Sequence, residues 1–366
     1  MKTLLVSLEY PPFKGGVANY YGNLAHYWPL GEQLSVLDNS RQELLDLSKD
    51  FKLLPPWWRS FGSINRKLTS GHFDYLLVGQ VLPLGTVAFV LSWFRSLPYA
   101  VFLHGLDLSS ALHSPRKRWL AALIFWRAKR VICANSYVAR LLVKSYSFLD
   151  EDKIEVINPG VAAGAPYVQP TTLLSLRQEH GLIDKVVLMT IGRLVRRKGV
   201  DNTIIALSLL SPEEKEKIVY VVAGVGPEEN YLKKLIKPED KERVLFLGEI
   251  SEEEKWQWLH ACDIFIMPAR HIAGDFEGFG IVYLEANICF KPVIAGQSGG
   301  VSDAVSDDYS GLLVDPDNPD SIATAISRLV KNKEERDLLG RQGQNRALVD
   351  FNWEKQAKKL LAIIKD

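Results

Sequence analysis

The chain has 366 residues, of which 47% are hydrophobic and 24% charged, and its formal net charge is +1. A chain of this length is too long for one ordinary hydrophobic core, so two domains are expected. The balanced charge argues against a nucleic-acid-binding protein, which usually carries a strong basic excess or a basic stripe.

The expected compartment is the cytoplasm. The apolar run at residues 3–8 is stopped by Glu9 and two prolines, which is typical of a buried strand and not of a signal peptide. The sequence contains no stretch of about 20 apolar residues, so no membrane-spanning helix is expected. Cys133, Cys262 and Cys289 lie far apart in apolar runs, which indicates reduced thiols and no disulfide or metal framework.

Short apolar runs along the chain predict buried parallel strands. Most are separated by segments with helical periodicity, such as 115–130 and 200–210. Strands that alternate with helices form βαβ units and parallel sheets. The ten expected strands are residues 3–8, 75–79, 99–105, 130–135, 153–158, 185–192, 218–224, 243–248, 263–268 and 291–296.

Ten strands are too many for one modest sheet. Residues 158–172 contain three prolines and no periodic pattern, which predicts an interdomain linker. The sequence therefore predicts an α/β protein with two doubly wound domains, residues 1–162 and 163–346. The remaining residues, 347–366, include an amphipathic helix whose packing partner the pattern does not identify.

The segments that follow the strands hold the candidate site residues, because ligands of doubly wound sheets bind at the carboxyl ends of the strands. Gly15 and Gly16 precede a predicted helix, where backbone amides can approach a phosphate, although a plain strand-to-helix turn is an equal alternative. His104 stands at the end of a predicted strand, which favours a functional histidine over a core histidine. Residues 193–198 contain four cations, which suit anionic oxygens, a solvated basic turn being the alternative.

The segment EGFGIVYLE begins at Glu277 and ends at Glu285. We expect a helix from Ile281 onward, with Gly278 and Gly280 at the N-terminal end of its first turn, where free N–H groups and the macrodipole favour anions. Glu277 would precede that turn, and Glu285 would lie roughly 7 to 8 Å further along the helix axis. Two carboxylates around a phosphate site suit the two polyols of a nucleotide diphosphate sugar. A capping Glu and a surface Glu would explain each residue singly, but not their joint placement.

Several further segments fit one known pattern, namely PPFKGGVANY, HGLD, VINPGV, GRLVRRKG, AGVGPEE, FLGEIS and EGFGIVYLEA. In these segments the chain resembles the retaining glycosyltransferases of family 4, and the resemblance runs nearly end to end. It looks most like the bacterial phosphatidylinositol mannosyltransferase branch, which uses GDP-mannose.

The resemblance implies a GT-B fold, in which two Rossmann-like domains face each other across a cleft and a C-terminal helix crosses back to the N-domain. It implies a hexosyltransferase that needs neither metal nor cofactor and uses a nucleotide diphosphate sugar, either GDP-mannose or, as the alternative, a UDP-sugar. The acceptor would be a glycan or lipid-linked hydroxyl in the synthesis of cell-surface polysaccharide or glycolipid. No nucleic-acid partner is implied.

The resemblance also assigns roles to matching residues. His104 would contact the donor sugar beside its anomeric carbon, while Arg193 and Lys198 would hold the diphosphate and stabilise its charge as it leaves. Glu277 would bind sugar hydroxyls and Glu285 the ribose. The remaining implied contacts are Gly15 and Gly16 with the donor phosphate, Gly278, Phe279, Gly280 and Ile281 with the sugar and phosphate, Gly248 and Ile250 with the base, and Asp107 with the acceptor side.

Two further features bear on metal and membrane. The Asp-x-Asp at 315–317 stands in a proline-containing segment, so it is expected to form a turn and no metal site. Trp and Arg interleave in residues 114–130, and 55–60 and 93–100 add more of both, which suits peripheral contact with an anionic membrane. The equal alternative is that the apolar residues of 114–130 pack on the sheet while its basic residues are solvated.

Three other functions are alternatives to a transferase. An epimerase or dehydrogenase would need a GxGxxG turn after the first strand, and that turn is absent. A glycan phosphorylase would need a lysine-bound pyridoxal cofactor in a longer chain. A non-catalytic nucleotide-sugar binding module would keep the same charged residues, so only turnover distinguishes it.

Overall fold

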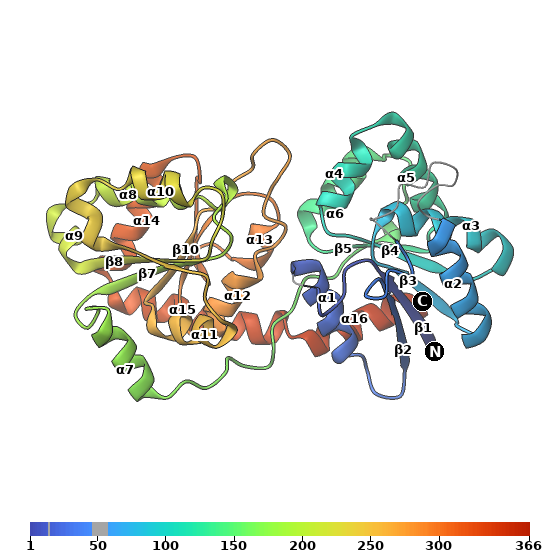
Figure 1. Cartoon of the computed structure of the whole chain (residues 1–366), viewed down its shortest axis with the longest axis horizontal. Coiled ribbons are helices and arrows are strands. Elements are labelled where there is room, and N and C mark those ends of the chain that lie inside the picture. The colour runs from blue at the N-terminus through green and yellow to red at the C-terminus, as the bar shows by residue number, and fades with distance from the viewer. Residues whose placement is uncertain (14, 46–57) are drawn as a thin grey trace. The chain divides into compact units, whose positions relative to one another are not determined.

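The computed structural model describes residues 1–13, 15–45 and 58–366 (Figure 1). These residues form two compact units. The N-terminal unit comprises Met1–Gly160 and Trp353–Asp366, and the C-terminal unit comprises Val161–Asn352. Each unit is a parallel sheet with helices on both faces, as Figure 1 shows. The prediction of two doubly wound α/β folds is therefore confirmed.

The N-terminal unit is built on β1 (Lys2–Ser7), β2 (Gln33–Asp38), β3 (Tyr75–Val78), β4 (Tyr99–Leu103), β5 (Arg130–Cys133) and β6 (Ile154–Val156). Its α-helices are α1 (Gly16–His26), α2 (Trp58–Gly71), α3 (Thr86–Arg95), α4 (Leu106–Leu112), α5 (Pro115–Arg127), α6 (Ser136–Ser145) and α16 (Trp353–Lys365). Two short turns, η1 (Val81–Gly85) and η2 (Glu151–Lys153), complete the described elements. The strand order is β2-β1-β3-β4-β5-β6.

The C-terminal unit is built on β7 (Val186–Ile191), β8 (Ile218–Ala223), β9 (Val244–Gly248), β10 (Ile264–Met267), β11 (Val293–Gly296) and β12 (Gly311–Val314), in the order β12-β11-β10-β7-β8-β9. Its α-helices are α7 (Pro170–Glu179), α8 (Val200–Leu209), α9 (Pro212–Lys217), α10 (Glu229–Leu235), α11 (Glu252–Ala261), α12 (Ile281–Ile288), α13 (Val301–Ala304), α14 (Pro319–Lys331) and α15 (Lys333–Asp350). The turns η3 (Arg196–Lys198) and η4 (Pro238–Arg243) are 3₁₀-helical.

Alternation along the strands gives the C-terminal sheet one hydrophobic core on each face. Val187 and Met189 pack with residues of α11, α12 and α15 in one core. Leu188, between them in sequence, packs with residues of α8 and α14 in the other. Successive strand residues point to opposite faces, so a run that is apolar at every position needs helices on both sides.

The C-terminal helix belongs to the N-terminal unit, as expected. Trp353 is 2% exposed and joins the core formed by Tyr20, Leu24 and Phe102. Its ring meets the ring of Tyr20 edge to face, with centroids 5.3 Å apart. The helix begins at Trp353 and not near residue 347, because residues up to Asp350 continue α15.

Two strands were missed by the sequence prediction. β2 and β12 are edge strands of their sheets. β2 has no buried residue, so its run lacks the continuous apolar character of a central strand. β12 has only four residues. Within the described residues, none of the helices combines the length and hydropathy needed to cross a membrane.

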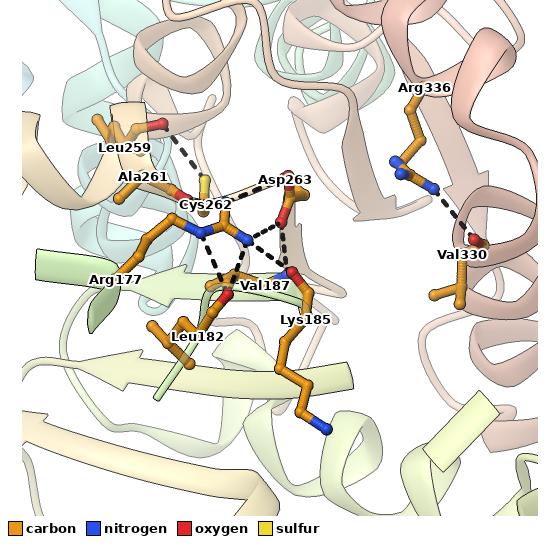
Figure 2. Close-up of polar contacts among 10 residues, drawn as sticks. All are labelled: Arg177, Leu182, Lys185, Val187, Leu259, Ala261, Cys262, Asp263, Val330 and Arg336. Carbon is orange, nitrogen blue, oxygen red and sulfur yellow. Dashed lines mark hydrogen bonds and ion pairs between the residues drawn. The ribbon is translucent and has the colours of Figure 1, made fainter. Parts of the chain in front are cut away.

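Arg177 ties α7 to the amino-terminal edge of the C-terminal sheet (Figure 2). Its guanidinium donates to the carbonyl oxygens of Leu182, Lys185 and Ala261 at 3.1, 2.6 and 3.0 Å. It also forms an ion pair with Asp263 at 3.2 Å. The same carboxylate accepts the N–H of Val187 at 2.7 Å, so one partly buried network joins α7, β7 and the start of β10.

Replacing Arg177 with methionine should lower the free energy of unfolding by about 3–5 kcal/mol, because Asp263 and several carbonyls lose their partner. Denaturant unfolding measures this. Arg336 is a matched control, since its guanidinium donates to the carbonyls of Leu329 and Val330 and forms no ion pair with the residues that the structure describes. Its replacement by methionine should cost about 1 kcal/mol. Equal costs for the two variants would contradict the anchoring role of Arg177.

Candidate functional site

The strand order of the C-terminal sheet reverses between β7 and β10. Crevices at such switch points bind ligands in doubly wound folds. The loop after β7 holds Arg193 and Lys198, and the loop after β10 leads to Glu277. Gly199 has φ +74°, and a Cβ there would stand 2.1 Å from the carbonyl oxygen of Pro268. Glycine therefore lets the two loops approach closely.

Glu277 is the centre of a charged cluster between these loops. It is buried, and its Oε2 accepts from Lys198 Nζ at 2.6 Å and from Arg197 Nη1 at 2.5 Å. Burial alone would raise the pKa of Glu277, but Lys198 and Arg197 outweigh it and hold that pKa below its ordinary value. Both cations bind Oε2, and no residue that the structure describes forms a hydrogen bond with Oε1.

The four cations of the first loop have four different environments. Lys198 and Arg197 bind Glu277, and Arg197 also contacts Asp275 at 3.2 Å. Arg196 is exposed and lies 3.6 Å from Glu228. Arg193 is exposed and makes no ion pair with any residue that the structure describes. The structure thus brings Lys198 to Glu277 but not Arg193, and it adds Arg197, which the sequence analysis did not single out.

The glycines directly precede α12, which starts at the expected residue. α12 starts at Ile281, and Gly280 is its N-cap residue with φ +77°. A Cβ at Gly280 would collide with the ring of Tyr283, at 2.3 Å. Phe279 is 5% exposed and packs against Phe351, with ring centroids 5.6 Å apart, so its side chain is part of the core.

Glu285 lies one turn into α12 and binds a lysine that the sequence analysis missed. Lys255 of α11 approaches Glu285 Oε1 at 2.8 Å and Glu252 Oε1 at 2.6 Å. Burial alone would lower the pKa of Lys255, but the two carboxylates raise it above its ordinary value. Gly248 ends β9 and Ile250 leads into α11, so the predicted base-binding turn directly precedes the helix that carries Lys255.

The other predicted site residues belong to the N-terminal unit. Gly15 is the N-cap residue of α1 and Gly16 its first residue. His104 follows β4, and burial lowers its pKa to about 4. Asp107 was expected on the acceptor side, yet its Oδ1 accepts the N–H groups of His104, Gly105 and Leu108 at 3.0, 2.9 and 2.9 Å. That oxygen therefore holds the loop after β4.

Metal ligands do not gather in either unit. Across residues 1–13, 15–45 and 58–366, no three His, Cys, Asp or Glu side chains form a group that could hold a metal ion. Asp315 of the Asp-x-Asp segment accepts the N–H of Asp317 at 3.0 Å, which is the geometry of a turn.

Comparison with known proteins agrees with this architecture. Residues 14–163 match the family described as Glycosyltransferase Family 4, and residues 175–366 match Glycosyl transferases group 1. The crystal structure of HepE from Anabaena in complex with UDP superposes with a TM-score of 0.80 at 20% identity and covers all of both chains. That likeness establishes the GT-B fold.

Two curated relatives are GDP-mannose-dependent alpha-(1-6)-phosphatidylinositol monomannoside mannosyltransferases. The protein of Mycolicibacterium smegmatis is 35% identical over 58% of this chain and 56% of its own length. The protein of Mycobacterium tuberculosis is 31% identical over 98% of this chain and 97% of its own length. Family matches across both units and a relative aligned over nearly the whole chain lead to one conclusion: the chain belongs to the group 1 glycosyltransferases, of family 4.

Proposed function

We propose that this glycosyltransferase moves an α-mannosyl group from GDP-mannose to a hydroxyl of a glycan or lipid-linked acceptor, with retention of configuration and without a metal. The observation that carries the proposal is the cluster of Lys198, Arg197 and Glu277 at the switch point of the C-terminal sheet. Two cations beside a carboxylate suit a diphosphate next to a sugar. The choice of GDP-mannose rests on the two mycobacterial relatives.

The chemistry of the proposed reaction is leaving-group stabilisation. As the sugar–phosphate bond breaks, negative charge builds on the departing phosphate and the sugar becomes oxocarbenium-like. Preorganised cations such as Lys198 stabilise that charge without reorganisation, which is the task a metal performs in other enzymes. Attack by the acceptor on the face that the diphosphate leaves would give retention, with the proton passing to the departing phosphate.

Thermal unfolding with GDP, UDP, ADP and dTDP, first without metal and then with magnesium, tests the donor. GDP at about 100 times its dissociation constant should stabilise the protein by about 2.7 kcal/mol. Glu285→Ala should abolish the shift, because the ribose loses its carboxylate acceptor. Glu252→Ala is the matched control, since Glu252 is the other partner of Lys255 but is exposed.

The outcomes of that experiment test the donor base, the metal requirement and the role of Glu285. If UDP stabilises and GDP does not, the donor is a UDP-sugar and the mannosyl assignment is wrong. If a nucleotide stabilises the protein only when magnesium is present, the proposed metal independence is wrong. If no nucleotide stabilises the protein, the assignment of Glu285 as the ribose-binding residue is wrong.

The proposed acceptor side includes peripheral contact with an anionic membrane through the N-terminal unit. Residues 75–149 contain nine Lys and Arg but a single carboxylate, Asp107, in a chain whose net charge is only +1. Trp119 and Trp126 on α5 are 66% and 53% exposed, while Ile124 and Phe125 of the same helix are buried. Ile124 and Phe125 therefore pack in the interior, while the two tryptophans are available for contact with a membrane. Residues 55–57 of the second Trp-containing segment lie outside the described residues.

Neighbouring aromatic groups extend this surface. Trp93 and Phe94 at the end of α3 are 59% and 80% exposed. The guanidinium of Arg127 on α5 lies over the ring of Trp93, 5.1 Å from its centroid, so α3 and α5 present their aromatic residues together. Interleaved aromatic and cationic side chains are typical of surfaces that insert into an anionic headgroup layer.

Replacing Arg116 and Lys117 together with alanine should weaken binding to phosphatidylglycerol-containing vesicles about 30-fold, since each cation near such a surface contributes about 1 kcal/mol. Arg118 is left intact because it donates to the carbonyl oxygen of Ser145. Vesicle sedimentation measures the change. The exposed pair Lys217 and Lys333 in the C-terminal unit is the control. Equal binding by both double variants would refute the lipid surface.

A further inference from the structure

The imidazole of His104 is held by aromatic rings in the N-terminal unit. The rings of Tyr20 and Tyr21 meet it edge to face, with centroids 5.0 and 5.3 Å away. The ring of Phe102 lies parallel to it, 6.4 Å away. His104 directly follows β4, and Tyr21 comes from α1, so the ring is oriented by two separate elements. The ring orientation therefore places Nε2 beside the Tyr21 hydroxyl and directs Nδ1 away from it.

A chain of two hydrogen bonds determines which nitrogen carries the proton. Tyr21 Oη lies 2.7 Å from the carbonyl oxygen of Gly79 and 2.8 Å from Nε2 of His104. A carbonyl oxygen can only accept, so the single hydroxyl hydrogen of Tyr21 is donated to Gly79. The hydroxyl oxygen must then accept from His104, which requires hydrogen on Nε2.

The position of Gly79 makes this arrangement rigid. Gly79 follows β3, and its N–H donates to the carbonyl oxygen of Val6 at 2.8 Å. A Cβ at Gly79 would stand 2.9 Å from Oγ of Ser7, so a larger residue would displace the backbone. The carbonyl that orients the Tyr21 hydroxyl is thus fixed by pairing with β1.

We infer that Tyr21 is a positioning residue that holds His104 as the neutral Nε2–H tautomer, so that Nδ1 is a hydrogen-bond acceptor for a ligand hydroxyl. Nδ1 has no hydrogen-bond partner among the residues that the structure describes. In a neutral imidazole with hydrogen on Nε2, Nδ1 carries a lone pair and cannot donate. It accepts from a sugar hydroxyl and repels a phosphate oxygen.

The surroundings of His104 support the neutral form. Burial lowers the pKa of His104 to about 4, so the ring is uncharged at neutral pH. Asp107 binds the backbone N–H of His104 and not its ring, so it orients the loop and leaves Nδ1 available. Placing that hydroxyl on the donor or acceptor sugar rests on the proposed function, whereas the tautomer does not.

Nitrogen-15 NMR of the full chain tests the tautomer directly, with His104→Gln to assign the resonances. Wild-type His104 should show hydrogen on Nε2 and an unprotonated Nδ1. Tyr21→Phe should shift the population toward the Nδ1–H form. Tyr20→Phe is the matched control, because Tyr20 also packs on His104 and donates to a carbonyl, that of Ile157 at 2.9 Å, but does not bind Nε2. Its spectrum should equal that of the wild type.

Two further probes test the acceptor role. GDP-mannose should perturb the Nδ1 resonance, while inorganic phosphate should leave it unchanged. Tyr21→Phe should lower kcat/KM about 10-fold, and Tyr20→Phe less than 2-fold. A wild-type Nδ1–H, an unchanged tautomer in Tyr21→Phe, or a response to phosphate would each overturn the inference. Absence of turnover with a correct tautomer would overturn the proposed function alone.

Discussion

Lys198→Met should reduce kcat roughly 10²–10³-fold, the loss typical of removing one preorganised group that stabilises developing negative charge. Lys198 is mostly buried, and its Nζ lies 2.6 Å from Glu277, at the point where the proposed diphosphate leaves. The fold should survive, because Arg197 remains as a partner for the Glu277 carboxylate. Initial-rate kinetics with the donor that the unfolding experiment identifies measures the effect.

Arg196→Met is the matched control for Lys198→Met. Arg196 and Lys198 share the η3 turn, but the Arg196 side chain is 62% exposed and is directed toward Glu228. Its removal should change kcat less than 2-fold, since an exposed ion pair contributes little. Similar losses in both variants would mean that the net charge of the turn, and not the placement of Lys198, supports the reaction.

Trp353→Ala should destabilise the N-terminal unit by about 3–5 kcal/mol, the cost of truncating a buried tryptophan. Trp353 packs against Tyr20, and Tyr20 packs against His104. The cavity left by the missing indole would therefore also loosen the packing around His104. Hydrogen exchange should therefore accelerate in β1, β3 and β4, and much less in β7 and β8.

Trp126→Ala provides the comparison, because that side chain is 53% exposed. Its truncation should change the free energy of unfolding by less than about 0.5 kcal/mol. If Trp353→Ala accelerated exchange equally in both sheets, α16 would not be an integral part of the N-terminal unit.

Local sequence pattern was sufficient for the central strands. Their residues are apolar at consecutive positions because both faces of a parallel sheet are covered, and that signal is contained within each run. β2 was not predicted because its residues are half-exposed or exposed at the edge of the sheet. The position of Glu285 on α12 was also predictable from the sequence, since the spacing of residues along a helix is determined by its 1.5 Å rise.

Which charged side chains pair with one another could not be predicted from local sequence pattern. Arg193, Arg196, Arg197 and Lys198 are close neighbours in sequence, yet only Arg197 and Lys198 reach Glu277. The direction of each side chain depends on the 3₁₀ turn and on the close approach of Gly199 to Pro268, which involves a second loop. The partnership of Lys255 with Glu285 likewise needs α11 and α12 to pack together.

The sequence by itself determined the fold class, the family and the positions of the two glutamates, because each is expressed in residues adjacent along the chain. Tertiary structure alone decided that Tyr21 orients His104 and that Trp353 completes the N-terminal core. These contacts join residues far apart in sequence. Their partners are selected by packing and by hydrogen-bond geometry, and neither property is encoded in any single segment.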